Sequence, residues 1–354
     1  MNRRSFLKLS GLLGVGAASA GIPSVASEAF IFKRKRHRVS ETRIAMGTFV
    51  SITVFHTSRD EAEEVMNKAF EEMVRMAGLM DRFDESTALA RLNREGFIED
   101  PPPEVVEVIA RALFHHKLSQ GNFDISVEPV VDLLEERVSE GKVLPTEKEL
   151  KEALELVGSD QIELEGRRIR FKKPGMGITL DGIAKGYAVD KGSEVLAGLG
   201  IENHLINAGG DIRTMGSKED EHPWTVAIQD PKKKKEYPDI VHMNDGAIAT
   251  SGDYENYYDQ GKRFHHIVNP KTGLSPEFTS SVTVRASTAM DADALATAVL
   301  VMEPAEGVVF IDSLPPYESL IVTKDGSQLK SKGWKSAAIS SFPFDPANRK
   351  RSWD

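Results

Sequence analysis

Segments with the two-residue alternation of β-strands and segments with the three- and four-residue spacing of α-helices follow one another irregularly along this chain. Helical spacing predicts helices over residues 60–80, 103–120, 146–156, 182–199 and 287–302. Alternation predicts strands, for example over residues 50–55, 162–171, 224–229 and 281–286. Because there is no regular strand–helix–strand repeat, the predicted class is α+β, with mixed sheets and packed helices. Residues 153–166 are the expected boundary between two lobes.

The last predicted helix combines an apolar face with two oxygen-bearing side chains. The apolar positions, three or four residues apart, are Ala294, Leu295, Ala298, Val299 and Met302. This spacing predicts a largely buried helix, on which Asp293 and Thr297 share a face because they are four residues apart. A carboxylate and a hydroxyl suit a hard cation such as Mg²⁺, which takes further ligands from water and phosphate. Alternatively, Asp291 caps the helix and Thr297 bonds a main-chain carbonyl.

The segment GKRFHHIVNPKTG precedes this helix and contains two adjacent histidines. Asn269-Pro270 and the following Gly273 predict a turn, so His265 and His266 would end a strand and face opposite sides of it. A neutral imidazole at a site can accept a proton or donate to a phosphate oxygen. A structural role is the alternative. The sequence has no HExxH motif, so no zinc site is predicted.

The segment ITLDGIAKGYAVDKG, residues 178–192, is predicted to form a strand, a tight loop bracketed by Gly182 and Gly186, and a helix that starts near Ile183. The first turn of a helix presents free N–H groups that favour an anion, and Lys185 adds a positive charge beside them. The spacings of the P-loop and of the dinucleotide fingerprint are both absent. The alternative is a strand that enters an ordinary helix.

Two further segments carry groups suited to ligand contact. Gly209-Gly210, between apolar runs, predicts either a hairpin turn or the close approach of a ligand. Thr250 and Ser251 supply hydroxyls near a strand end. Phe83 and Phe123 are candidates for stacking on a flat ring, with a place in the core as the alternative.

Nine strings in this chain occur in the order found in one enzyme family. They are MGTFVSITV, DRFDESTALARLN, GNFDISVEPVV, ITLDGIAKGYAVDKG, LINAGGDIRTMG, WTVAIQDP, AIATSGDYENYY, GKRFHHIVNPKTG and DADALATAVLVM. The chain therefore resembles the ApbE family, the FAD:protein FMN transferases. The resemblance implies an ApbE-like (T-fold-like) domain over residues 41–342 with FAD bound between lobes. It also implies transfer of FMN from FAD to a Thr of an exported acceptor flavoprotein, with Mg²⁺ present and AMP released.

The resemblance assigns roles to particular residues. The implied metal ligands are Asp293, Thr297 and the carbonyl of Gly182, and the implied catalytic residues are His266 and Asp293. The implied FAD contacts are Met46, Phe83, Asn122, Phe123, Asp124, Thr179, Asp181, Lys185, Ser251 and His266.

The sequence departs from the common family pattern at several of these places. Thr179 stands where many members have Asp, and Asp181 where many have Gly, so the Asp181 carboxylate is the expected substitute. Asn122, Glu128 and Asn269 also depart from the common pattern. An FAD pyrophosphatase that yields FMN and AMP, and a non-catalytic periplasmic FAD-binding protein, are the alternative functions. A complete metal pair favours an enzyme over a binder.

The N-terminus predicts the compartment. Arg3-Arg4 followed by Ser-Phe-Leu-Lys and a short apolar stretch resembles a twin-arginine signal over residues 1–26, cleaved after residue 20 or 26. A basic linker is expected over residues 27–40 and a polar tail over 343–354. The apolar stretch is too short to span a bilayer, so no transmembrane span is expected in the mature chain. We expect a periplasmic or otherwise extracytoplasmic protein.

Composition narrows the partners. The chain has no cysteine, so it is expected to carry neither disulfides nor a lipoprotein anchor. Removal of residues 1–20 takes away three basic and no acidic side chains, which moves the formal net charge from −9 to −12. This acidic balance argues against nucleic acid as a partner.

Overall fold

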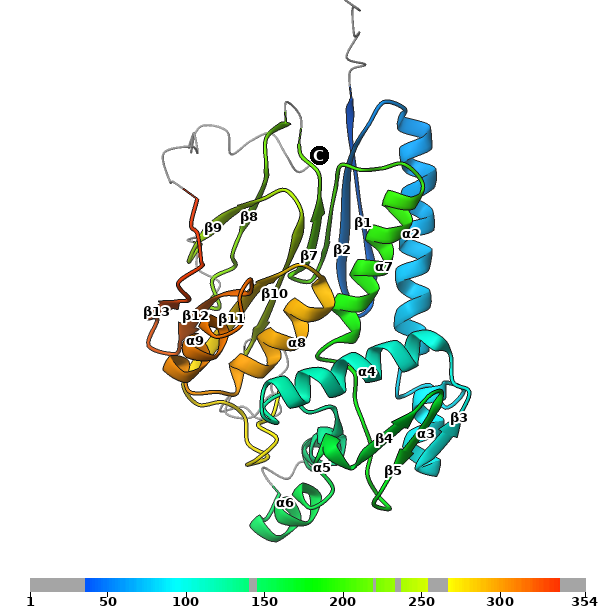
Figure 1. Ribbon diagram of the computed structural model, residues 1–354, viewed down its shortest axis with the longest axis vertical. Helices are drawn as coiled ribbons and strands as arrows, with labels where there is room; N and C mark the ends of the chain where they lie inside the picture. The colour runs from blue at the N-terminus through cyan, green and yellow to red at the C-terminus, as the bar shows by residue number, and fades with distance from the viewer. Residues whose placement is uncertain (1–35, 140–144, 219–220, 233–236, 254–266, 338–354) are drawn as a thin grey trace, which may run out of the picture. The chain divides into compact units, whose positions relative to one another are not determined.

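The computed structural model describes residues 36–139, 145–218, 221–232, 237–253 and 267–337. Its main feature is an eight-stranded sheet in which every neighbouring pair of strands is antiparallel (Figure 1). In spatial order the strands are β1 (His37–Ala45), β2 (Thr48–His56), β6 (His204–Ala208), β7 (Asp211–Met215), β10 (Gly246–Gly252), β11 (Thr279–Ala286), β12 (Glu318–Thr323) and β13 (Gln328–Lys330).

Helices cover one face of this sheet. They are α2 (Arg59–Leu79), α7 (Ala184–Gly198), α8 (Ala289–Leu300) and α9 (Pro304–Asp312). Strand alternation decides which side chains meet them: Val50, Ile52 and Val54 of β2 are fully buried in a core shared with α2 and α7. The residues between them, such as Ser51, face the other side.

A smaller pair of strands packs on the opposite face. β8 (Trp224–Ala227) and β9 (Ile240–Met243) form a two-stranded antiparallel sheet. Val226 and Val241 from this pair join Ile212 and Ile248 of the large sheet in one apolar core. The end of β10 therefore has helix α8 on one side and β8–β9 on the other.

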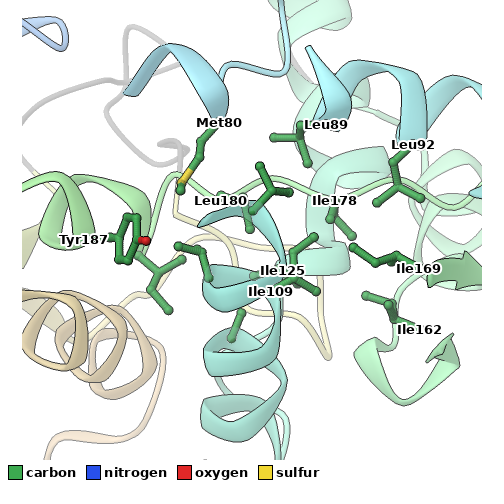
Figure 2. Packing of buried hydrophobic residues seen from close by; sticks show 14 of the residues in the cluster. Met80, Leu89, Leu92, Ile109, Ile125, Ile162, Ile169, Ile178, Leu180 and Tyr187 are labelled. Atoms are coloured by element: carbon green, nitrogen blue, oxygen red, sulfur yellow. The ribbon is translucent and has the colours of Figure 1, made fainter. Parts of the chain in front are cut away.

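The remaining elements bury two further apolar clusters, a large one and a small one to which α-helical residues 130–134 and Ala153 belong. They are α3 (Ala88–Glu95), β3 (Phe97–Glu99), α4 (Pro103–Leu118), η1 (Ile125–Val127), α5 (Glu128–Ser139), α6 (Glu147–Leu154), η2 (Ser159–Gln161), β4 (Ile162–Glu165) and β5 (Arg168–Phe171). The short strands form a sheet in the order β3-β5-β4. Figure 2 shows the large cluster, in which Leu92, Ile109 and Ile169 lie in one core with Leu180, which precedes α7, and Tyr187, which lies in its first turn.

The predicted α+β class and the five predicted helices are confirmed, and every helix end lies within two residues of the predicted one. Among the helices that the structure describes, three were missed: α3, α5 and α9. Two of them have only eight and nine residues, which is too few turns for apolar spacing to stand out, and tertiary packing stabilises such short helices. Among the described helices, none has the length and apolar character needed to cross a bilayer.

Three expectations about organisation are wrong. Residues 37–40, placed in the linker, belong to β1 and pair with β2. Residues 153–166 do not separate two units, because Ile162 is buried in the same core as Ile109 and Tyr187. The strand expected at residues 178–180 is not a strand: Thr179 donates its N–H to the Ile125 carbonyl outside any sheet. The predicted signal and the tail lie outside the described residues.

Candidate active site

A cleft of about 890 Å³ lies where several turns and helix ends converge. Its walls come from the β1–β2 turn, the connection between α4 and α5, the start of α7, the β6–β7 turn, the end of β10 and the buried helix α8. The two-residue β1–β2 turn holds Met46 and Gly47 at positive φ, as a tight hairpin turn requires, and so places Met46 in the cleft wall. Of the two alternatives for Gly209-Gly210, the hairpin turn is confirmed, and Gly209 also lines the cleft.

The structure brings the candidate site residues together. All but one of them line this cleft: Met46, Phe83, Asn122, Phe123, Asp124, Thr179, Asp181, Gly182, Lys185, Ser251, Asp293 and Thr297. The exception, His266, lies outside the described residues. Positions separated by up to 251 residues in sequence thus share one surface, which supports treating them as one site.

The three candidate metal ligands converge at the inner end of the cleft. Asp293 and Thr297 lie one turn apart on α8, and a Cβ placed on Gly182 would lie 3.1 Å from Thr297 Oγ1. The Gly182 main chain therefore packs directly against the Thr297 hydroxyl. Ser251 Oγ, from the end of β10, lies 3.2 Å from the same hydroxyl. Carboxylate, hydroxyl and main-chain carbonyl are all hard oxygen donors, so this set fits Mg²⁺.

The Asp293 carboxylate is almost completely buried, with 5% of the residue exposed. Burial raises its pKa to about 6, although the Lys185 charge and the Gly186 N–H both favour the ionised form. Among the described residues, no three His, Asp or Glu side chains are grouped for metal binding. A cation here would therefore depend on the mixed donor set and on ligand phosphates.

The profile of the ApbE family matches residues 46–321. The chain belongs to the ApbE family. An FAD:protein FMN transferase of Vibrio cholerae is 34% identical over 275 residues, which cover 75% of this chain and 80% of that protein. The FAD:protein FMN transferase of Escherichia coli K12 is 28% identical, with 86% and 88% covered.

Solved structures agree with this assignment. The ApbE protein of Thermotoga maritima has a TM-score of 0.77 and 30% identity, and the match covers 84% of this chain and 97% of that one. The flavin transferase ApbE of Vibrio cholerae has a TM-score of 0.72 and 28% identity, with 84% and 98% covered.

Where this chain departs from the common ApbE pattern, the two altered residues contact each other. The Thr179 hydroxyl donates to Asp181 Oδ2 at 2.7 Å, and the Asp181 N–H donates back to Thr179 Oγ1 at 3.3 Å. Thr179 is buried, whereas Asp181 is exposed at the cleft wall. The carboxylate at this place in the cleft is thus the one on Asp181, as the sequence argument expects, and its role in binding stays a prediction.

Asp124 lies at the cleft wall, but its carboxylate is occupied within the protein. It accepts hydrogen bonds from the N–H and hydroxyl groups of both Ser126 and Ser159, and His116 Nδ1 lies 3.1 Å away. Burial alone would raise the pKa of Asp124, but the bonds from His116 and the serines outweigh it and lower the pKa. Asp124 therefore shapes the loop that carries Phe123, a role that its sequence position did not reveal.

The two candidate aromatic residues differ in exposure. Phe123 is only 3% exposed, and its ring packs edge-on against His115, so it is mainly a core residue with one edge at the cleft. Phe83 is 70% exposed and lines the cleft, with the Arg82 guanidinium 4.2 Å from its ring centroid. Of the two, Phe83 is the one that offers ring surface to a ligand.

Sequence reasoning missed the charged group beneath Phe83. The Arg82 side chain is 6% exposed and donates to Asp132 Oδ1 at 2.6 Å, and Arg82 Nη1 lies 3.8 Å from Glu128 Oε1. Burial, followed by the Asp132 charge, raises the pKa of Glu128 to about 7. The only signal in the sequence was that Glu128 departs from the common family residue.

Two local predictions around α8 and α7 are wrong. Asp291 does not cap α8: Thr288 does, by accepting the Asp291 N–H. The Asp291 carboxylate instead accepts hydrogen bonds from Nε and Nη2 of Arg111, at 2.6 and 2.7 Å. Gly186 does not close a loop but lies in the first turn of α7, where a Cβ would collide with the Ala289 carbonyl. Helix contact, rather than a turn, explains this glycine.

Proposed function

We propose that this protein is an Mg²⁺-dependent FAD:protein FMN transferase that binds FAD in the large cleft and modifies a Thr of an acceptor flavoprotein. The observation that carries the proposal is the convergence of Gly182, Asp293 and Thr297 in a cleft of about 890 Å³. This volume lies near the upper end of the range for small-molecule sites, roughly 300–1,000 Å³. Membership of the ApbE family supplies the reaction class.

The reaction exchanges a phosphoanhydride bond of FAD for a phosphoester bond to the acceptor. The Thr oxygen of the acceptor forms a bond to the phosphorus on the FMN side of the pyrophosphate. The bond from that phosphorus to the bridging oxygen breaks, and AMP leaves with the bridging oxygen. The hydroxyl proton passes to a base and then to solvent, and no redox change occurs. Such transfers depend mainly on positioning and on charge neutralisation.

The residues of the cleft fit these needs. When bound, Mg²⁺ would neutralise pyrophosphate charge, and Asp293, Thr297 and the Gly182 carbonyl would hold it. Lys185, which stands 3.5 Å from Asp211, adds a fixed cation beside the start of α7. Phe83 offers its exposed face to a flat ring, and Ser251 offers a hydroxyl next to Thr297.

The base in this proposal is His266, whose ring would accept the proton of the acceptor hydroxyl. The FAD would lie between the core built from residues 76–188 and the end of the large sheet, because the cleft walls come from both. We also propose that the enzyme acts outside the cytoplasm after twin-arginine export, on the strength of the signal pattern in residues 1–26.

The test is a transfer assay. Residues 27–354 are incubated with FAD and Mg²⁺, with and without an acceptor flavoprotein domain that carries the Thr, and acceptor mass is followed together with AMP. A mass gain of FMN less water, matched by AMP, is the expected result. AMP with free FMN and no acceptor gain would favour the pyrophosphatase, and intact FAD in both samples would favour the binding protein.

Asp293→Asn separates a metal role from a structural one. Its amide oxygen can still accept the Gly186 N–H, so folding should be retained while the negative charge is lost. Transfer should fall sharply and should require a higher Mg²⁺ concentration. Unchanged transfer at every Mg²⁺ concentration would remove Asp293 from the metal site. Export is tested separately, by substitution of Arg3-Arg4 with Lys-Lys and fractionation of the cells.

A further inference from the structure

A second, smaller cleft of about 320 Å³ adjoins the large one. Thr48, Gly209 and Thr250 line both clefts, so the two cavities meet at these residues. Consecutive residues of a strand face opposite sides of a sheet: Ser251 reaches Thr297 of α8, whereas Thr250 faces away from that helix. The small cleft therefore lies on the face of the sheet opposite the candidate metal ligands, and the two faces communicate at the end of β10.

The floor of the small cleft is a row of residues across neighbouring strands. Ser51 pairs with Asn207, Asn207 with Ile212, and Ile212 with Ile248, and all four line the cleft. One wall is formed by residues 226–229, from β8 onward. Among the described lining residues there is no Asp, Glu, Lys or Arg. This surface suits uncharged polypeptide rather than phosphate.

Among the strands that the structure describes, β8 has no partner on the edge that faces this cleft. Within the described part of the chain it pairs only with β9. The Ile228 N–H donates to Asp239, so in the antiparallel pattern the main-chain groups of Val226 and Ile228 point toward β9 and those of Thr225 and Ala227 point away from it. Ala227 lines the cleft and is exposed. Because no described strand pairs with this edge, the Ala227 N–H and C=O can bond an added strand.

An apolar rim stands beside this edge. Ile44 and Phe49 are directly opposite each other on β1 and β2, and they are 79% and 68% exposed. Phe49 also lines the small cleft. Exposed apolar pairs next to an open strand edge are typical of surfaces that bind a partner.

We propose that the small cleft binds an extended segment of the acceptor flavoprotein, which adds as a strand to the free edge of β8. The segment's main chain would bond the outward N–H and C=O of Ala227, and the rim at Ile44 and Phe49 would cover its apolar side chains. Its Thr would then reach the large cleft past Thr250 and Gly209. This inference rests on the proposed function, because it names how the acceptor of that reaction is held.

A matched pair of variants on β2 tests the cleft. Ser51 and Thr53 face the same side of the sheet, and each has a hydroxyl 2.7 Å from a β1 hydroxyl, on Thr42 and Ser40 respectively. Only Ser51 lines the cleft. Ser51→Phe should fill it and raise the KM for the acceptor about tenfold or more, with FAD affinity unchanged. Thr53→Phe should behave as the wild type.

A second pair tests the strand edge. Ala227→Pro removes an N–H that points away from β9, which an edge strand tolerates, and Ala227→Ser keeps it. The proline variant alone should raise the KM for the acceptor, while FAD binding, measured by flavin fluorescence, stays constant.

The outcomes separate the two proposals. Normal acceptor KM in both Ser51→Phe and Ala227→Pro, in a preparation whose wild type transfers FMN, overturns the docking inference and leaves the transferase standing. Weaker FAD binding in Ser51→Phe also overturns it, because the cleft would then belong to the nucleotide site. Absence of transfer by the wild type to any Thr-bearing acceptor overturns both.

Discussion

The main-chain N–H of Gly186, in the first turn of α7, donates a hydrogen bond of 3.1 Å to Oδ2 of Asp293 on α8. Two more hydrogen bonds join the same helices in the opposite direction. The Asp190 carboxylate of α7 accepts the N–H groups of Ala289 and Met290 at the start of α8, both at 2.9 Å. Each carboxylate satisfies amides that a helix start leaves open. These three hydrogen bonds hold α7 and α8 together at the place where Asp293 lines the cleft.

Gly186→Ala should disrupt this arrangement. A Cβ at residue 186 would collide with the Ala289 carbonyl, which belongs to rigid helix backbone, so α7 and α8 must separate. We expect a loss of about 1–3 kcal/mol in the free energy of unfolding and a marked loss of transfer. Denaturant unfolding measures the first. Gly198→Ala, at the other end of α7, is the control: its Cβ meets no atom within 4 Å, so stability should hold or rise.

Thr297→Val tests the hydroxyl at the candidate metal site. Valine keeps the shape of threonine but removes the oxygen that lies 3.2 Å from Ser251 Oγ. The Mg²⁺ concentration for half-maximal transfer should rise about tenfold or more, because one oxygen donor is lost. Thr297→Ser keeps the donor and should stay close to the wild type. If both variants titrate alike, Thr297 is a packing residue.

Variants of Asp181 test whether its carboxylate replaces the one that many family members carry at position 179. Asp181→Asn should weaken FAD or Mg²⁺ binding, because Thr179 supplies no charge to replace it. The double variant Thr179→Asp with Asp181→Gly restores the common family pattern and should recover binding. Isothermal titration with FAD and Mg²⁺ measures both. Wild-type affinity in Asp181→Asn would show that neither position needs a carboxylate here.

Phe83→Leu tests the exposed ring. Because Phe83 is 70% exposed, its replacement should leave the melting temperature unchanged. FAD affinity should fall about two- to tenfold through the loss of ring stacking. Phe97→Leu is the matched control, since Phe97 is also partly exposed, on β3, but lines neither cleft. Equal FAD affinities in the two variants would remove Phe83 from the flavin site.

Glu128 makes stability depend on pH. Burial and the nearby Asp132 raise its pKa from an ordinary 4.5 to about 7 in the folded protein. Below about pH 4.5 the carboxyl is protonated in both states. Between about pH 4.5 and 7 the carboxyl ionises in the unfolded chain before it does in the folded protein. The free energy of unfolding of the wild type should therefore fall by about 1–3 kcal/mol relative to Glu128→Gln over this range, with the loss complete above about pH 7.

The measurement is urea unfolding of both proteins between pH 5 and 8.5. Glu71→Gln, at an exposed position on α2, should follow the wild-type profile throughout. Parallel profiles for Glu128→Gln and the wild type would mean that Arg82 already holds Glu128 ionised across this range.

The spacing of residues along the chain was sufficient to predict the features that depend only on neighbours in sequence. The three- and four-residue spacing in α8 predicted both its burial and the shared face of Asp293 and Thr297. The paired glycines offered the β6–β7 turn as one of two alternatives, because positive φ costs glycine least. Motif order was sufficient to gather residues that do line one cleft.

What the sequence by itself determined, then, was the buried face of the five predicted helices, the alternation of strands such as β2 and β11, and the described residues that meet at the cleft. Tertiary structure decided their partners. It engaged Asp124 with Ser159, placed Arg82 under Phe83 and joined Gly186 to Asp293 across 107 residues. Periodicity reports only which way a side chain points from its own element, whereas a buried charge takes whichever donor the packing of distant elements brings within reach.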